Sequence, residues 1–180
     1  MSSVRRVIVG ASGSPGSLQA LRYAQHLARD YDATLVPVLA WLPPGGDLAD
    51  RRTPDGELRR IWAQDAHHKL QHVLSLAWGT PPADPPVQPL VRRGRPGPVL
   101  VDAACRPGDL LVVGAGRRGA LAWIGGRVSR YCRAHAWCPV LALPPTPLGH
   151  EARRAALARV FWHRTLTTDQ ISPHVRGAAA

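Results

Sequence analysis

The feature that most restricts the fold of this chain is an apolar strand pattern that runs into glycines and then into a helix. Asp109 opens the apolar run LLVV at 110–113, the glycine-rich stretch GAGRRG follows at 114–119, and a helix is expected to begin near Gly126. Such a run is typical of a parallel strand covered on both faces, and open α/β sheets bind ligands beyond the carboxyl ends of these strands. A helix N-terminus there favours phosphate. The stretch indicates a nucleotide site, although a crossover whose glycines only form turns fits its composition equally well.

A similar strand, turn and helix open the chain. Residues 4–10 read VRRVIVG and predict a strand, which leads into the glycine and serine turn at 10–16. Ser14 is placed to cap the helix that Pro15 begins. Apolar residues then recur at helical spacing as far as about Asp30, so this segment predicts an amphipathic helix.

The alternation of strands and helices continues to residue 143. Further strands are expected at Ala33–Trp41, Val87–Val91, Asp109–Val113 and Pro139–Leu143. Further helices are expected from Leu58 to about Ala77, at Gly97–Cys105, and after Gly126, where Val128, Tyr131, Cys132 and His135 share one face. Five strands alternating with four helices predict an α/β fold with an open parallel sheet and helices on both faces.

The pattern changes after Pro147. Residues 1–145 are expected to form one domain, and residues 146–180 a C-terminal extension. Within the extension, Glu151–Arg164 predicts a short basic helix with a narrow apolar stripe, followed by a disordered end. The connection from Pro43 to Gly56 is rich in proline, glycine and charge, which predicts mobility.

Composition excludes several classes of protein. Three cysteines without CxxC spacing argue against a disulfide framework or a zinc knuckle, and predict free, mostly buried thiols. No apolar run approaches the roughly 20 residues of a membrane helix, so a soluble, cytoplasmic protein is expected. The net charge of +11 would attract polyanions, but the arginines are scattered and no specific nucleic-acid binding is expected.

Two classes of nucleotide-binding protein are disfavoured because this chain lacks side chains that their sites require. The single lysine, Lys69, lies in a helical stretch, so there is no Walker A lysine and no P-loop chemistry. The stretch at 114–119 is literally G-x-G-x-x-G, but no acidic residue follows it before Glu151. Because dinucleotide sites use a carboxylate about 20 residues on to hold the ribose, a dehydrogenase is only a minor alternative.

Neither the serines nor the histidines form a catalytic or metal centre in the sequence pattern. Ser12 and Ser14 lie outside any G-x-S-x-G motif, and capping explains both. His68 and His72 are four residues apart on one helix and would grip a metal as a pair, but no third ligand is spaced nearby, which favours a solvated helix face. We therefore expect a binding protein rather than an enzyme.

Three segments together resemble the universal stress protein family. They are VGASGS at 9–14 with its following helix, LLVVG at 110–114, and VSRY at 128–131 continuing to HAWCPVL at 135–141. The last segment is similar to the family's usual VS…HAPCPVLVV. The resemblance spans residues 4 to 143 and implies a five-stranded parallel sheet in the order 3-2-1-4-5. It also implies a homodimer formed through the last strand.

The resemblance further implies an ATP site, with several substitutions. ATP-binding members read G-x-x-G-x(9)-G-[S/T] and carry an Asp in the first loop near the adenosine. In this chain Ser12 aligns with that Asp, the loop at 114–116 is one residue short, and Arg127 aligns with the phosphate-facing serine. Loss of the carboxylate removes a charge-assisted hydrogen bond of roughly 1.5–3 kcal/mol, whereas an arginine at a helix start either grips phosphate or fills the pocket.

The candidate nucleotide-binding residues follow from this alignment. They are Gly10, Ser12, Ala40, Val113, Gly114, Gly116, Gly126, Arg127, Val128 and Ser129. The expected function is a stress-response regulator that binds an adenine nucleotide, ATP, weakly or in altered form and acts on a further protein partner. A dimeric adaptor that has lost nucleotide binding is the alternative.

Overall fold

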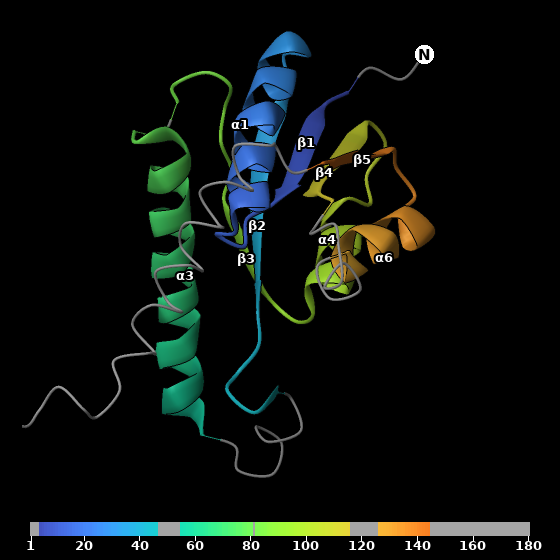
Figure 1. Ribbon diagram of the computed structural model, residues 1–180. Coiled ribbons are helices and arrows are strands. Elements are labelled where there is room, and N and C mark those ends of the chain that lie inside the picture. The colour runs from blue at the N-terminus through green and yellow to red at the C-terminus, as the bar shows by residue number, and fades with distance from the viewer. Residues whose placement is uncertain (1–3, 47–54, 81, 116–125, 145–180) are drawn as a thin grey trace, which may run out of the picture. The chain divides into compact units, whose positions relative to one another are not determined.

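Strands and helices alternate throughout the part of the chain that the computed structural model describes, which is residues 4–46, 55–80, 82–115 and 126–144. These residues all lie within the compact unit Met1–Pro145. The elements are β1 (Arg6–Gly10), α1 (Pro15–Asp30), β2 (Thr34–Trp41), α3 (Gly56–Trp78), β3 (Leu90–Arg93), α4 (Pro96–Ala103), β4 (Asp109–Gly114), α6 (Arg127–His135) and β5 (Val140–Leu143) (Figure 1).

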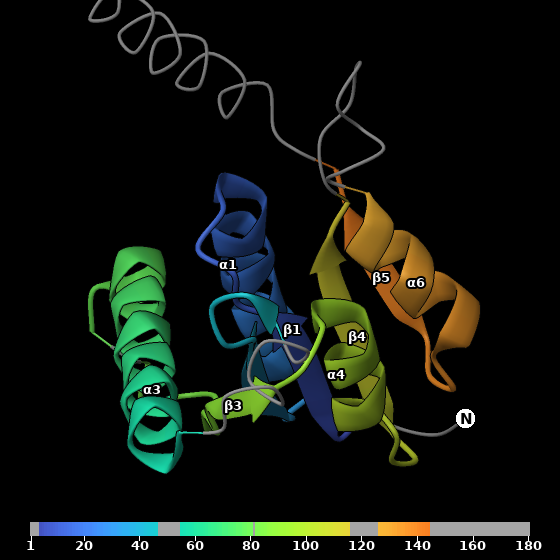
Figure 2. The same cartoon turned by 90° about the horizontal axis from the view of Figure 1, so that it is seen from below.

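The five strands form one sheet in the order β3-β2-β1-β4-β5, and all neighbouring strands are parallel. The expected α/β class and strand order are confirmed. Helices α1 and α3 lie on one side of the sheet, and α4 and α6 on the other (Figure 2). The order reverses between β1 and β4, so the carboxyl ends of these two strands mark the point where such sheets bind ligands.

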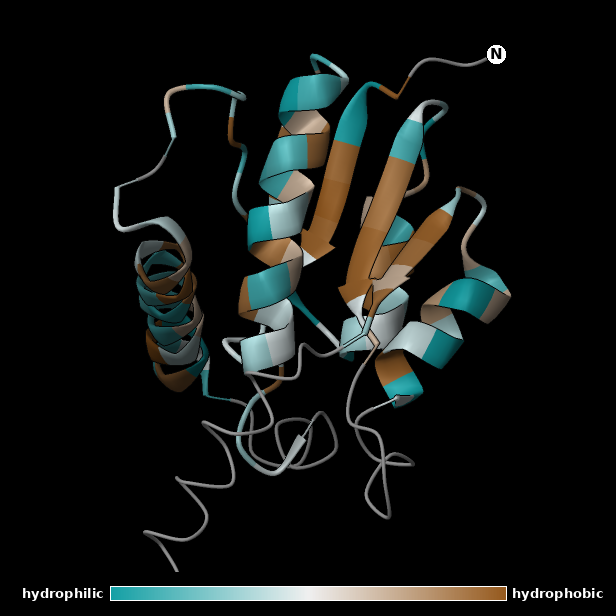
Figure 3. Ribbon diagram, turned by 45° about the horizontal axis from the view of Figure 1, so that its top comes forward, coloured by the Kyte–Doolittle hydropathy of each residue, from teal (hydrophilic) through white to brown (hydrophobic). Residues whose placement is uncertain are grey.

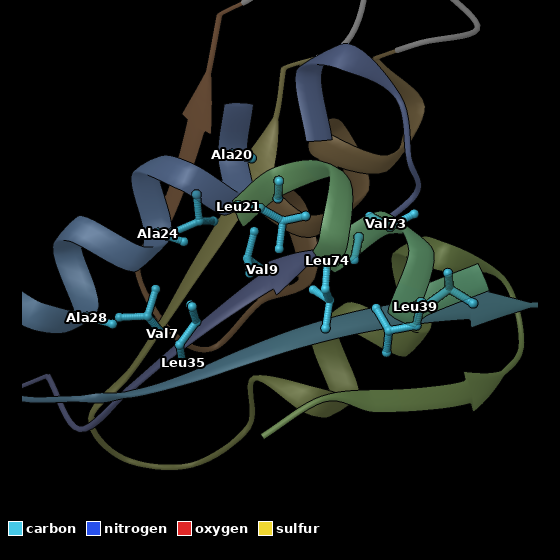
Figure 4. Close-up of a cluster of buried hydrophobic side chains, with 14 of the residues drawn as sticks. Val7, Val9, Ala20, Leu21, Ala24, Ala28, Leu35, Leu39, Val73 and Leu74 are labelled. Carbon is cyan, nitrogen blue, oxygen red and sulfur yellow. The ribbon is translucent and has the colours of Figure 1, made fainter. Parts of the chain in front are cut away.

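Alternate residues of the central strands build two separate cores. Val7, Val9 and Leu35 pack against α1 and α3, and the side chains from these elements converge in Figure 4. Ile8 and Leu111 point the other way, into the core beneath α4 and α6. Because both faces are covered, the strands are apolar along most of their length (Figure 3), as buried parallel strands must be.

Local signals explain where the two long helices start and how one ends. The Ser14 hydroxyl accepts a hydrogen bond from the Ser17 amide at 3.2 Å, so the expected cap of α1 is confirmed. Asp55 caps α3 in the same way through the Glu57 and Leu58 amides. At the other end of α3, the guanidinium of Arg22 donates to the carbonyl of Ala77 at 2.9 Å, which ties α1 to α3.

The third strand differs from its expected bounds, Val87–Val91. Val87 forms only an isolated bridge with Leu35, and the continuous ladder begins where Leu90 pairs with Val38. Both pairings have the same offset, so Pro89 falls opposite Pro37, and neither residue has an N–H to donate. The ladder is interrupted there and extends instead through Arg93, whose polar side chain hid the strand end from the sequence pattern.

The face of α6 that the spacing predicts is only partly buried. Cys132 is buried, whereas Tyr131 and His135 are exposed, and their rings stack with centroids 4.1 Å apart. Tyr131 lies against α4, where Gly97 leaves room for its ring, and Ser129 takes the buried position with Cys132. The cysteines are free as expected, but Cys105 is exposed because it follows the end of α4 in a loop.

Other expectations fall on residues outside the described ranges. These are the C-terminal extension at 146–180 with its helix at Glu151–Arg164, and most of the connection between Pro43 and Gly56. Among the described helices, none has the length and apolar character to span a membrane.

Candidate functional site

The candidate site lies at the carboxyl edge of the sheet, where segments distant in the sequence come together. We call this edge the crest, and define it as residues 10–17, 40–42, 92–97, 114–115 and 126–130. At its centre, β4 approaches the first turn of α1 so closely that a Cβ on Gly114 would stand 3.0 Å from the carbonyl oxygen of Gly16. A Cβ on Gly10, by contrast, would face Leu100 of α4 at 3.3 Å. The backbones of β4 and the first turn of α1 therefore pack directly against each other at the centre of the crest, and a side chain at Gly114 would clash with Gly16.

The first crest loop holds Ser12 by a short chain of hydrogen bonds. The Ser12 hydroxyl donates to the Ser14 hydroxyl at 3.2 Å, and Ser14 in turn accepts from the Ser17 amide. Ala11 is buried and its amide donates to the carbonyl of Val38, which fixes the loop to β2. Ser12 itself is exposed. It presents a neutral hydroxyl at the end of β1.

The N-terminus of α6 supplies the opposite wall of the crest. Gly126 is the N-cap and makes no side-chain capping hydrogen bond, so no cap occupies the amides of the first turn within the described residues. Arg127, the first helical residue, is exposed. Unpaired amides and the positive end of the helix dipole favour an anion, and the guanidinium adds a full charge beside them.

The remaining candidate side chains do not face a ligand. Val113 is buried in the core beneath α4 and α6, and Ala40 and Val128 pack against that core. Ser129 is buried, and its hydroxyl donates to the carbonyl of Gly126 at 3.1 Å, which closes the first turn of α6. These residues position the crest backbone, and Ser12 and Arg127 are the exposed side chains among the candidates described. Gly116 lies outside the described residues.

Sequence reasoning missed three crest residues. Gly16 was assigned only to the helix start, yet its backbone contacts β4 at Gly114. Arg92 and Arg95 are exposed at the end of β3 and the start of α4, and Arg92 is the register partner of Ala40. The predicted strand ended at Val91, two residues too early. Extending it to Arg93 would have placed the run RRGRPG at 92–97 at the carboxyl end of the sheet.

The other sequence candidates form no centre. His68 and His72 are both exposed on α3, as expected for a solvated helix face. Among the described residues no group of three His, Cys, Asp or Glu is placed to hold a metal ion. Burial raises the pKa of the Cys132 thiol to about 11, and burial together with the charge of Asp109 raises the pKa of Cys138. Both thiols stay protonated at neutral pH and are poor nucleophiles.

The chain matches a known family of proteins. The family model described as Universal stress protein family matches residues 3–144. A search of curated proteins finds no significant match.

Solved structures share the fold at low identity. A universal stress protein in complex with cAMP has 23% identity and a TM-score of 0.53, and the match covers 81% of this chain and 100% of that one. UspA from Lactobacillus plantarum has 19% identity and a TM-score of 0.55, and the match covers 79% of this chain and 99% of that one. The hypothetical protein MJ0577 has 14% identity and a TM-score of 0.61, and the match covers 80% of this chain and 98% of that one.

Proposed function

Since this chain belongs to the universal stress protein family, we propose that it is a cytoplasmic stress-response protein that binds an adenine nucleotide at the crest and acts by binding rather than by turnover. The observation that carries the proposal is the convergence of bare backbone and positive charge. Gly114 approaches Gly16 over the sheet centre, and the first turn of α6, whose N-cap Gly126 has no side chain to cap it, carries the exposed Arg127.

The proposed pose follows from the order of the strands. The phosphates take the α6 amides and Arg127, because a helix N-terminus and a guanidinium both favour phosphate oxygens. The base takes the end of β2 at Ala40, and the ribose crosses β1 beside Ser12, since β1 lies between β2 and β4. The structural neighbour with 23% identity is a complex with cAMP, an adenine nucleotide, which supports this ligand class.

Binding to ATP is proposed to be weak or altered. Ser12 offers a neutral hydrogen bond in place of a charge-assisted one, a difference of about 1 kcal/mol or more and so roughly a decade of affinity. Arg127 acts in the opposite direction by adding a charge for the phosphates. Together, the two residues are expected to shift the binding free energy from contacts with the sugar to contacts with the phosphates.

The test is a search for nucleotides released from the purified native protein by mass spectrometry, followed by calorimetric titration with ATP, ADP and AMP. We expect heat of binding that the substitution Gly126→Trp abolishes, because an indole at the N-cap would cover the α6 amides. Leu76→Trp, at an exposed position on α3, is the matched control and leaves binding unchanged. No released nucleotide, and no heat up to about 1 mM ligand, equivalent to about −4 kcal/mol, would overturn the proposal.

A second function, a nucleotide-free dimeric adaptor, is favoured by one surface feature. Trp137 is 93% exposed immediately before β5, and β5 is an edge strand of the sheet. An exposed indole beside an unpaired strand edge is a ready contact for a second copy of the chain or a protein partner. Sedimentation of the wild type and of Trp137→Ser, together with the nucleotide titration, separates the two functions, because an adaptor forms a dimer through this surface and gives no heat of binding with nucleotide.

A further inference from the structure

The described crest carries arginines but no carboxylate. Of its residues, Arg92, Arg93, Arg95, Arg127 and Arg130 are exposed, and none of the residues in the five crest segments is Asp or Glu. Two acidic side chains at the start of α3 already have partners: Asp55 caps α3, and Glu57 pairs with Arg60 at 2.6 Å. The potential over the crest is therefore positive well beyond the α6 end, where the 5′-phosphates are proposed to lie.

Arg92 and Arg95 supply this charge on the base and sugar side of the crest. Arg92 pairs in register with Ala40, the residue proposed to flank the base. Residues two apart on a strand lie on the same face of the sheet. Arg92 therefore lies on the same face as Leu90, which packs against the core beneath α4. Arg95 is the N-cap residue of α4, and its side chain is exposed at the same end of the sheet.

The charge on the sugar side of a nucleotide site decides which sugar it accepts. A carboxylate there accepts hydrogen bonds from free ribose hydroxyls and repels a phosphate ester, whereas a nearby arginine accommodates the ester, as in the NAD and NADP sites of dinucleotide enzymes. In this chain Ser12 stands beside the proposed ribose position, and two arginines stand on its β2–β3 side.

We propose that the preferred ligand is an adenine nucleotide that carries a phosphate ester on its ribose 2′ or 3′ hydroxyl, bound through Arg92 and Arg95. This inference rests on the proposed function, since it assigns the ligand class of the same site. Ser12 permits the ester because, unlike a carboxylate, its hydroxyl brings no negative charge.

The experiment compares four probes by calorimetry at fixed ionic strength: AMP, ADP, adenosine 3′,5′-bisphosphate and adenosine 2′,5′-bisphosphate. ADP carries its second phosphate at the 5′ end, so it controls for the number of phosphates. We expect at least one bisphosphate to bind about tenfold or more tighter than AMP, and tighter than ADP, because each charge-assisted arginine contact is worth about a decade of affinity.

Variants locate the effect. Arg92→Gln with Arg95→Gln is expected to reduce the affinity of the preferred bisphosphate to that of AMP, while the affinity for AMP changes little. Arg106→Gln, an exposed arginine before β4 at the opposite edge of the sheet, is the matched control and keeps the preference. Ser12→Asp is expected to reverse the order, since its carboxylate favours the free hydroxyls of AMP and repels the ester.

The outcomes separate the two proposals. If AMP or ADP binds and neither bisphosphate binds tighter than ADP, the ribose-phosphate inference is wrong and the proposed function stands. If a bisphosphate is preferred but the double arginine variant keeps the preference, the assignment to Arg92 and Arg95 is overturned. If none of the four probes binds up to about 1 mM, a free energy of about −4 kcal/mol, both proposals fail together.

Discussion

Arg6 and Asp109 face each other at the amino ends of β1 and β4 and form a two-point ion pair. The Arg6 guanidinium donates to the two carboxylate oxygens at 2.8 and 2.6 Å, and it also reaches the carbonyl of Ala103 at 3.1 Å. The Arg106 amide donates to Asp109 as well, so the carboxylate, whose side chain is 1% exposed, has three donors. This pair fixes the register of the two central strands at the edge opposite the crest.

Asp109→Asn is expected to lower the free energy of unfolding by about 3 kcal/mol, because it leaves the Arg6 guanidinium without a negatively charged partner and replaces one acceptor oxygen of a buried network with an NH₂ group. Denaturation by urea measures the change. Asp102→Asn makes the same chemical change at an exposed position on α4 and is expected to stay within about 0.5 kcal/mol. Equal effects of the two substitutions would show that the ion pair contributes nothing specific.

Gly114→Ala and Gly16→Ala are expected to have opposite effects on stability. A Cβ at Gly114 meets the Gly16 backbone at 3.0 and 3.1 Å, and this strain costs roughly 1–3 kcal/mol. A Cβ at Gly16 has nothing within 4 Å and lies inside α1, where alanine stabilises a helix by about 0.5–1 kcal/mol. Thermal melts of the two variants give the comparison. A stable Gly114→Ala protein would contradict the close approach.

The three thiols are expected to react with iodoacetamide in the order Cys105, Cys138, Cys132. Cys105 is exposed, Cys138 is partly buried with a raised pKa, and Cys132 is fully buried with a pKa of about 11. Only the thiolate reacts, and a raised pKa lowers its fraction. Peptide mapping after timed labelling gives the order. Early labelling of Cys132 in the folded protein would show that α6 opens readily from the sheet.

Stability is expected to fall with pH above about 9. The Cys132 thiol has its usual pKa of 9.0 in the unfolded chain and about 11 in the folded protein. Its contribution is therefore complete below pH 9 and is lost as the pH rises toward 11, with a slope of up to about 1.4 kcal/mol per pH unit. The slope should become shallower in Cys132→Ala and stay unchanged in Cys105→Ala. Urea denaturation at several pH values measures it.

The sequence predicts elements best where caps and apolar spacing agree. Ser14 and Pro15 place the start of α1 correctly, and Asp30 is its last residue. β3 was misplaced because its pairing depends on Pro89 lying opposite Pro37, a relationship between strands distant in the sequence. The surroundings of Tyr131 could not be predicted for a similar reason, since the space that it fills lies beside Gly97 of another helix.

For the candidate site, the sequence identifies the positions but not what each side chain does. Motif alignment selects both Ser12 and Ser129. In the structure Ser12 is exposed, whereas the Ser129 hydroxyl donates a hydrogen bond to the carbonyl of Gly126. The identity of the residues does not determine such hydrogen-bond partners, because these depend on the local backbone geometry. The arginines at the end of β3 were overlooked because their place beside Ala40 depends on the strand register.

The stabilising ion pair and the candidate binding site lie at opposite ends of the central strands. Arg6 and Gly10 lie at opposite ends of β1, about 13 Å apart at a rise of about 3.3 Å per residue. Substitutions at that distance without shared partners act independently. Side chains at the carboxyl end of the sheet can therefore be changed, and with them the ligand, while the ion pair at the amino end keeps the strands in register.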